Sequence, residues 1–179
     1  MRIIGGKLKG KNILPPQGYK ARPTTDFAKE GLFNVLNNEY EMEGLKVLDL
    51  FGGTGAISYE FASRGASMVY CVEMLPLHAN FIKSQAVKFG MNNLTVVRHN
   101  VFDFLEICRE KFDIIFADPP YAIDGLADIP DKVFSKDILH PGAYFILEHP
   151  EEFDFSGHPR FIKEKKYGNV HFSFFENNQ

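Results

Sequence analysis

The chain has 179 residues, of which 45% are apolar and 24% are charged, a composition typical of one globular domain. No apolar run approaches the roughly 18 residues that a membrane helix requires, and the N-terminus lacks the apolar segment of a secretion signal. We therefore expect a monomeric, soluble, cytoplasmic protein with one domain over residues 1–179. The two cysteines, Cys71 and Cys108, form neither a disulfide framework nor a C-x-x-C site, so no metal site is predicted.

Charge is distributed unevenly along the chain. Residues 1–29 contain seven basic side chains against Asp26 alone, a charge of +6, whereas the remaining residues carry −9. Lysines and arginines bind nucleic acid by displacing counterions from phosphates, although solvated basic termini are also common. We predict that residues 1–23 form a basic arm or hairpin, with Lys7, Lys9 and Lys11 as candidate phosphate contacts.

The predicted elements begin with a helix over residues 24–37, in which Ala28, Leu32 and Leu36 share one stripe and Thr24 or Thr25 is the N-cap. From residue 45 onward, short apolar runs alternate with stretches of helical period. Strands are expected at residues 46–51, 68–73, 95–98, 113–117 and 143–148, and helices at 55–63, 76–89, 102–109 and 126–134. The strands are too uniformly apolar to have a solvated face, so they predict a buried parallel sheet.

The C-terminal part breaks this alternation. Phe161–Lys166 and Val170–Phe175 are separated by only three residues, which leaves no room for a crossover helix and favours a hairpin. The phenylalanines of this part are expected mainly in the core. The predicted fold class is therefore α/β, with a mostly parallel sheet that ends in an antiparallel C-terminal hairpin strand.

A glycine-rich loop follows the first predicted strand, and its candidate ligand contacts are Asp49, Phe51, Gly52, Gly53 and Gly55. The loop lacks the lysine of a phosphate-binding P-loop, and a dinucleotide fingerprint would need a glycine where Ser58 stands. Asp49 would repel a pyrophosphate but suits a ligand with an α-amino group. S-adenosylmethionine has that group and no phosphate, so it is favoured over NAD; a turn without a ligand is the other alternative.

A second acidic residue, Glu73, ends the next predicted strand 24 residues after Asp49, with Met74 directly behind it. A carboxylate at this place can accept hydrogen bonds from both hydroxyls of a ribose. Both NAD and S-adenosylmethionine contain a ribose, so this spacing supports a nucleoside ligand without choosing between them.

The tetrapeptide Asp118-Pro119-Pro120-Tyr121 follows the fourth predicted strand. It resembles the motif of S-adenosylmethionine-dependent methyltransferases that modify exocyclic amino groups of bases. The resemblance implies that the Asp118 carboxylate and the Pro119 carbonyl accept hydrogen bonds from the amine, and that the prolines stiffen the turn. Tyr121 would stack on the extruded base.

Further motifs narrow this resemblance to one family. Arg2-Ile3-Ile4-Gly5-Gly6, then Arg22-Pro23-Thr24-Thr25-Asp26 with Glu30 and Leu32-Phe33-Asn34 behind it, precede the tetrapeptide in that order. Together they resemble the RsmD family of bacteria, and the similarity runs from Arg2 to about Gly168. The family implies a class I, Rossmann-like methyltransferase fold. It also implies transfer of a methyl group to N2 of one guanine of 16S ribosomal RNA, conventionally numbered 966, in the small ribosomal subunit, with S-adenosylhomocysteine as the second product.

The family resemblance also implies roles for individual residues. Thr24 and Thr25 would line the methionine side of the cofactor pocket, while Asn100 and Val101 would face the adenine. Asn100 could equally be a simple turn residue. Arg22 is open to three roles, because it could contact the cofactor or the substrate or support the start of the helix.

Three positions depart from the usual family pattern: Phe27 and Lys29, where relatives more often carry arginine, and Ser58, where many carry glycine. Lys29 keeps a charge for binding phosphate but loses the guanidinium fork. The prediction is that these changes affect RNA affinity more than the type of reaction.

Three rival functions stay open, namely a DNA methyltransferase for adenine N6 or cytosine N4, a non-catalytic RNA-binding assembly factor, and, more remotely, an NAD-dependent oxidoreductase. The pair Glu148-His149 either caps a strand or lines the base pocket, and His78 and His99 are expected at the surface.

Overall fold

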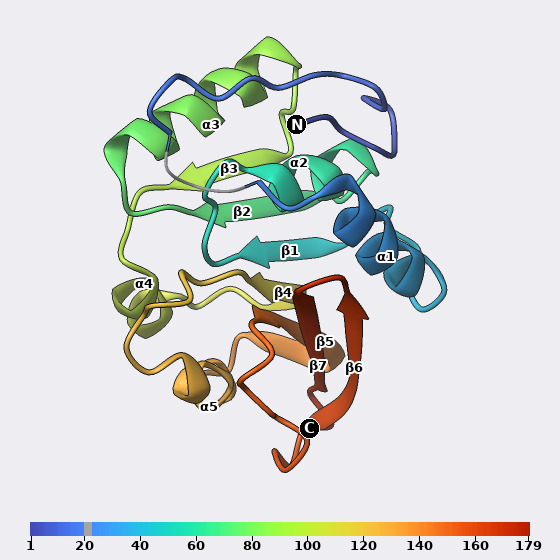
Figure 1. Cartoon of the computed structure of the whole chain (residues 1–179), viewed down its shortest axis with the longest axis vertical. Helices are drawn as coiled ribbons and strands as arrows, with labels where there is room; N and C mark the ends of the chain where they lie inside the picture. Colours follow the sequence, from blue (N-terminus) through green and yellow to red (C-terminus); the bar gives the residue numbers. More distant parts are fainter. Residues whose placement is uncertain (20–22) are drawn as a thin grey trace.

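The computed structural model describes residues 1–19 and 23–179, and this part of the chain contains one seven-stranded sheet (Figure 1). The strand order is β3-β2-β1-β4-β5-β7-β6. Strands β1 to β5 are parallel neighbours, whereas β7 pairs antiparallel with both β5 and β6, so the predicted fold class is confirmed. The strands are β1 (Lys46–Asp49), β2 (Met68–Val72), β3 (Leu94–Val97), β4 (Phe112–Ala117), β5 (Leu139–His149), β6 (Phe161–Tyr167) and β7 (Val170–Glu176).

Helices cover both faces of the sheet. Side chains of α1 (Asp26–Asn37), α2 (Ala56–Ser63) and α3 (Pro76–Lys88) belong to one hydrophobic core, and those of α4 (Val101–Ile107) and α5 (Ile129–Phe134) belong to a second. This division gives the three layers expected when a buried parallel sheet hides both of its faces. None of the helices in residues 1–19 and 23–179 combines the length and apolar character of a membrane-spanning segment.

Most of the predicted elements are confirmed, with shifts of a few residues at their ends. The helix expected at 126–134 is divided into a 3-10 turn, η1 (Leu126–Asp128), and α5, which has Pro130 in its first turn. Strand β5 starts earlier than expected, at Leu139, and includes Gly142 at φ +77°. Of the two N-cap candidates, Thr25 caps α1, because its hydroxyl accepts a hydrogen bond from the Ala28 amide.

Residues 1–13 form a small hairpin that is attached to α2. Arg2 and Asn12 form an antiparallel bridge, and Ile3 and Ile13 are buried. The Ser63 hydroxyl, in the last residue of α2, donates to the Gly5 carbonyl at 2.6 Å. Figure 1 shows the following segment crossing over α3 toward the side where β1, β2 and β3 end. Residues 1–19 therefore extend from the C-terminal end of α2, at Ser63, to the glycine-rich loop at the carboxyl ends of the parallel strands, where Tyr19 contacts Gly53.

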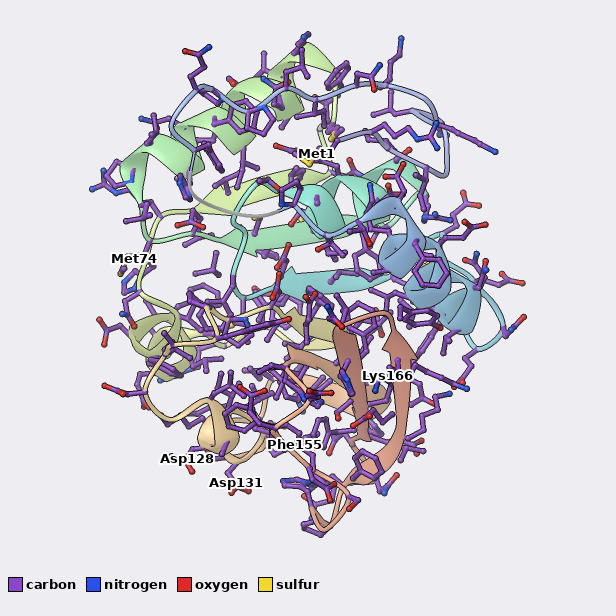
Figure 2. The ribbon with its side chains drawn as sticks, in the orientation of Figure 1. Met1, Met74, Asp128, Asp131, Phe155 and Lys166 are labelled. Atoms are coloured by element: carbon purple, nitrogen blue, oxygen red, sulfur yellow. The ribbon has the colours of Figure 1, made fainter. Side chains whose placement is uncertain are left out.

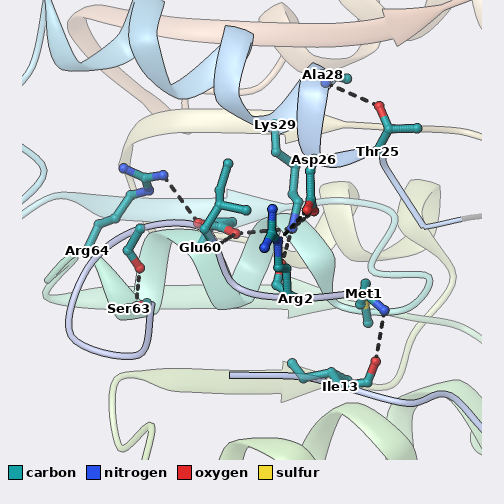
Figure 3. Close-up of polar contacts among 12 residues, drawn as sticks. Met1, Arg2, Ile13, Thr25, Asp26, Ala28, Lys29, Glu60, Ser63 and Arg64 are labelled. Carbon is teal, nitrogen blue, oxygen red and sulfur yellow. Dashed lines mark hydrogen bonds and ion pairs between the residues drawn. The ribbon is translucent and has the colours of Figure 1, made fainter. Parts of the chain in front are cut away.

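A buried ion pair joins α1 to α2 (Figure 3). The Lys29 ammonium lies 3.2 Å from the Glu60 carboxylate, and it also donates to the backbone carbonyl of Arg2. Lys29 is only 1% exposed. This burial contradicts the prediction that Lys29 binds RNA phosphate, because its charge is already paired inside the protein.

Candidate active site

Four carboxyl groups meet at the carboxyl edge of the parallel strands. Asp49 ends β1 and Glu73 directly follows β2, while Asp118 follows β4 and Glu148 lies at the end of β5. The register pairs Asp49 of β1 with Phe116 of β4, so Asp118 lies two residues beyond the position that faces Asp49. It also pairs Ala117 with Leu147, which brings Asp118 beside Glu148. The sheet therefore joins the glycine-rich loop and the Asp-Pro-Pro-Tyr motif in one site.

The glycine-rich loop is held against the end of β2. The Gly53 amide donates to one oxygen of the Glu73 carboxylate at 2.8 Å, and the Leu75 amide donates to the other oxygen at the same distance. A Cβ atom on Gly52 would lie 2.5 Å from the Cys71 sulfur, and Gly55 has φ +83°. Only glycine fits both places without strain. Each carboxylate oxygen of Glu73 keeps a second lone pair with which it can accept from a ribose hydroxyl.

Asp49 is a buried carboxyl group with one unpartnered oxygen. The carboxyl group is 1% exposed, and its Oδ2 accepts from the Ser58 hydroxyl at 2.6 Å. Its Oδ1 is buried without a hydrogen-bond partner among the residues that the structure describes. Burial raises the pKa of Asp49 to about 6. Ser58, one of the three departures from the family pattern, thus holds this carboxyl group through a direct hydrogen bond.

Tyr19 closes one side of the loop, although the sequence analysis did not single it out. Its hydroxyl donates to the Gly53 carbonyl at 2.6 Å, and its ring stacks on His78 with 3.9 Å between the ring centroids. His78 is 8% exposed, which contradicts its predicted place at the surface. Tyr19 is the one aromatic residue in residues 1–23, and this was the available signal in the sequence.

Asn100 and Met74 lie at the adjoining ends of β3 and β2. The Asn100 side chain caps α4 by accepting from the Phe102 amide at 2.9 Å, and its amide nitrogen lies 3.8 Å from the Met74 sulfur. Met74 is 55% exposed, and Figure 2 shows it at the edge of the molecule. Asn100 therefore has the turn role that the sequence also allowed, while its amide group stays accessible.

The other residues predicted at the cofactor pocket differ in exposure. Val101, next to Asn100, is buried, and Phe51 is half-buried between β1 and the glycines. Thr24 is half-buried, whereas the hydroxyl of exposed Thr25 is used as the helix cap.

The Asp-Pro-Pro-Tyr turn presents one carboxyl group and one aromatic ring. Asp118 is half-buried and Pro119 is buried, while Pro120 is exposed and the Tyr121 side chain is 46% exposed. Burial, with the neighbouring charges of Glu148 and Asp49, raises the pKa of Asp118 well above its usual range. The turn is closed by a hydrogen bond from the Ile123 amide to the Pro120 carbonyl.

Glu148 and His149 point to different sides of the sheet. Glu148 is 5% exposed and accepts a long hydrogen bond, 3.4 Å, from the Tyr121 hydroxyl. Burial raises the pKa of Glu148 to about 7. His149 is fully buried on the opposite face, where its ring contacts the Ser173 hydroxyl at 2.7 Å. Only Glu148 faces the reactive motif.

The structure separates most of the predicted RNA contacts from the carboxyl groups. Lys7, Lys9 and Lys11 are exposed, but the amide of Lys7 is bonded to Ser63 at the far end of α2 from Gly55. Their contact with RNA stays a prediction. Arg22, the remaining basic candidate, lies outside the described residues.

Comparisons with known proteins find a matching family model, similar relatives and similar solved structures. The family model described as "Conserved hypothetical protein 95" matches residues 1–176. A protein of Buchnera aphidicola named ribosomal RNA small subunit methyltransferase D is 30% identical over 181 residues, which cover 99% of this chain and 92% of that protein. A solved structure of a hypothetical protein from Thermus thermophilus is 30% identical with a TM-score of 0.87, covering 98% of this chain and 99% of the other. A putative methyltransferase from Escherichia coli is 28% identical with a TM-score of 0.85, covering 99% and 97%.

Proposed function

The chain belongs to the family described as conserved hypothetical protein 95, and on that premise we propose that it transfers a methyl group from S-adenosylmethionine to N2 of a guanine in 16S ribosomal RNA. The relative from Buchnera aphidicola is named for methylation of small-subunit ribosomal RNA, and the choice of guanine N2 comes from the resemblance of the sequence motifs. The whole chain would act as one methyltransferase domain and as a monomer.

One observation carries this proposal. Asp49, Asp118 and Glu148 form a group of carboxyls at the sheet edge, and the groups that shift their pKa values include no lysine or arginine of the described residues. A poorly solvated group of acids without a cation favours a ligand that carries positive charge, because such a ligand stabilises their ionised forms and lowers their pKa values. S-adenosylmethionine has both a sulfonium and an α-amino group, whereas NAD has a pyrophosphate that this site would repel.

The residues present fit the methyl donor. Asp49 has a buried oxygen free to accept from the α-amino group, and Glu73 can accept from the ribose hydroxyls. Asn100 and Val101 would contact the adenine, and Gly52 lets the loop pack closely on the end of β2, because a Cβ there would lie 2.5 Å from the Cys71 sulfur. When bound, this cofactor supplies an electrophilic methyl group on a positively charged sulfur and leaves as S-adenosylhomocysteine.

The chain itself orients the acceptor. The exposed ring of Tyr121 offers a stacking surface for an extruded guanine, and the Asp118 carboxyl with the Pro119 carbonyl accepts hydrogen bonds from the amine. A guanine held in this way would have its amine nitrogen directed at the methyl group that the cofactor would supply, and the methylated amine would release its proton to solvent. Positive charge that develops on the nitrogen is stabilised by Asp118, so positioning and electrostatics supply the catalysis.

The deciding experiment measures transfer of labelled methyl groups to three substrates: hypomethylated small ribosomal subunits, free 16S RNA and duplex DNA. Mass spectrometry then identifies the modified nucleoside. We expect N2-methylguanine in small subunits, with less product in free RNA. Methyladenine or methylcytosine in DNA would contradict the proposal and favour a DNA methyltransferase, and cofactor binding without transfer to any substrate would favour a binding role.

A further inference from the structure

Glu148 is a buried carboxyl group with one unused oxygen. It lies at the end of β5 beside the Asp118 turn, and its side chain is nearly inaccessible at 5% exposure. Oε1 accepts the long hydrogen bond from the Tyr121 hydroxyl. Oε2 is buried and has no hydrogen-bond partner within residues 1–19 and 23–179.

A purely structural carboxyl group is expected to have its partners inside the protein. Burying an unpaired carboxyl oxygen destabilises a fold, and most buried polar atoms are hydrogen-bonded. The next residue, His149, illustrates the usual case, since both of its ring nitrogens have partners, Ser173 and the Pro150 carbonyl. The unused oxygen of Glu148, next to the reactive carboxyl of Asp118, therefore indicates a donor that arrives with a ligand.

We propose that Glu148 selects guanine by accepting the hydrogen bond of its ring N1–H group, while Asp118 and Pro119 hold the neighbouring N2 amine. This inference rests on the proposed function and adds a specificity-determining residue to it. Tyr121 links the two tasks, because the ring that stacks on the base also holds Glu148 through its hydroxyl.

The chemistry of the base edges explains the selectivity. Guanine places a ring N–H directly beside its exocyclic amine, so two hydrogen-bond donors face two carboxyl groups. Adenine and cytosine place a bare ring nitrogen beside their amines, and its lone pair would face the Glu148 oxygen. A site that leaves such a group unpaired rejects the wrong ligand strongly. The same motif can thus be directed to guanine by the residue at the end of the neighbouring strand.

The test compares guanine with 2-aminopurine, which keeps the amine on C2 but lacks the N1–H group. Small subunits are reconstituted on 16S RNA that carries either base at the methylated position, and kcat/KM for methyl transfer is measured for each. At pH 8, where Glu148 with its pKa of about 7 is ionised, we expect the unmodified protein to prefer guanine by about 10- to 100-fold, the range for a hydrogen bond to a charged acceptor. In Glu148→Gln the preference should fall below about threefold, because an amide can turn to present either a donor or an acceptor.

Two controls separate this role from a general loss of structure. Glu152→Gln removes an exposed carboxylate whose charge also acts on Tyr121, and it should keep the full preference for guanine. Calorimetric affinity for S-adenosylhomocysteine should be nearly the same in Glu148→Gln and in the unmodified protein, since this product lacks the sulfonium charge and its proposed contacts are with Asp49 and Glu73.

The outcomes are distinguishable. Equal rates on guanine and 2-aminopurine with the unmodified protein would overturn the role of Glu148 and leave the proposed function standing. An undiminished preference in Glu148→Gln would overturn it as well. No methyl transfer to guanine by the unmodified protein would overturn the proposed function and this inference together.

Discussion

The Lys29 ammonium lies 3.2 Å from the Glu60 carboxylate, and neither side chain is more than 1% exposed. Removal of Lys29 takes the buried cation away from Glu60, whose remaining partners are the Arg64 guanidinium at 3.3 Å and the Ile4 amide at 2.8 Å. We therefore expect Lys29→Met to lower the free energy of unfolding by about 3 kcal/mol, the lower end of the range for breaking a buried ion pair. The double variant Lys29→Met with Glu60→Leu should be no more stable than Lys29→Met, because it also deprives the Arg64 guanidinium and the Ile4 amide of their acceptor, and urea titrations measure both.

An exposed ion pair provides the control for this prediction. Lys111 pairs with Asp137 at 2.7 Å, but the two side chains are 40% and 84% exposed. Lys111→Met should therefore change the free energy of unfolding by less than about 1 kcal/mol. Equal losses in Lys29→Met and Lys111→Met would show that burial of the Lys29 pair has no energetic consequence.

Asp118 can be tested separately from cofactor binding. Asp118→Asn replaces the carboxyl group that holds the reacting amine with an amide that cannot take up negative charge, and we expect kcat for methyl transfer to fall at least 100-fold, roughly the scale for removing one electrostatic contact to a transition state. Calorimetric affinity for S-adenosylhomocysteine should be largely retained. Asp124→Asn, an exposed change in the same loop, should have normal activity. Substantial turnover in Asp118→Asn would remove Asp118 from the reaction.

The hydroxyl of Tyr19 is expected to support the cofactor loop. Tyr19→Phe keeps the stack on His78 but loses the hydrogen bond to the Gly53 carbonyl. A hydrogen bond contributes about 1 kcal/mol, so affinity for S-adenosylhomocysteine should fall roughly fivefold. Tyr40→Phe is the matched control, because it removes a similar bond to the Gly142 carbonyl far from the site. An equal change in both variants would argue against a special role for Tyr19.

The exposed lysines of the hairpin make a prediction about salt. If Lys7, Lys9 and Lys11 bind phosphates, RNA affinity should decrease steeply with salt concentration. Changing all three to glutamine should reduce the slope of log K against log salt by about 0.7 to 0.9 for each phosphate that is no longer neutralised. Filter binding of the RNA substrate at several salt concentrations measures this slope.

A control for the hairpin lysines uses two lysines that already have acidic partners. Lys111→Gln with Lys136→Gln removes charges that are paired with Asp137 and Glu106. This double variant should leave the salt dependence nearly unchanged. An unchanged slope in the triple variant would exclude the hairpin from the RNA interface.

The layout of the fold could be predicted because local patterns and global fold agree. Apolar runs bounded by glycine, proline and asparagine identify the five parallel strands, and the three-residue connection after Lys166 identifies the final hairpin. The family resemblance is confirmed by the family model and by the Buchnera aphidicola relative. Asp49, Glu73 and Asp118 could be placed together because parallel strands end at one edge of the sheet.

The residues that were misjudged have partners distant in the sequence. Lys29 looks like a surface lysine on α1 until Glu60 of α2 is seen beside it. His78 looks exposed until Tyr19 of the arm is stacked on it. For Glu148 the sequence left open whether it lines the base pocket, because its orientation follows from the pleat of β5 and from the register with β4, neither of which composition reveals. Tertiary contacts, rather than local propensity, determine the burial of Lys29 and His78 and the orientation of Glu148.

Glu148 also makes a prediction about stability that requires no substrate. Burial raises its pKa from the ordinary 4.5 to about 7, so the folded protein binds this proton more tightly than the unfolded chain does. The proton stabilises the fold fully below about pH 4.5, and this contribution is lost as the pH rises toward 7 and above. Glu148→Gln has no such titration. Its free energy of unfolding relative to the unmodified protein should therefore rise between about pH 4 and pH 8, by on the order of 3 kcal/mol.

The neighbouring acids affect this comparison in known directions. Asp49 keeps its raised pKa, about 6, in both proteins, so its contribution to the pH dependence of the unfolding free energy cancels in the difference. Asp118 feels the charge of Glu148, so the variant also relieves repulsion at high pH, which adds to the expected change with the same sign. Urea titrations at pH 4, 6 and 8 measure the effect, with the exposed Glu151→Gln as a control that should show a constant difference. A constant difference for Glu148→Gln as well would mean that Glu148 titrates as an ordinary exposed carboxyl group, against its burial beside Asp118.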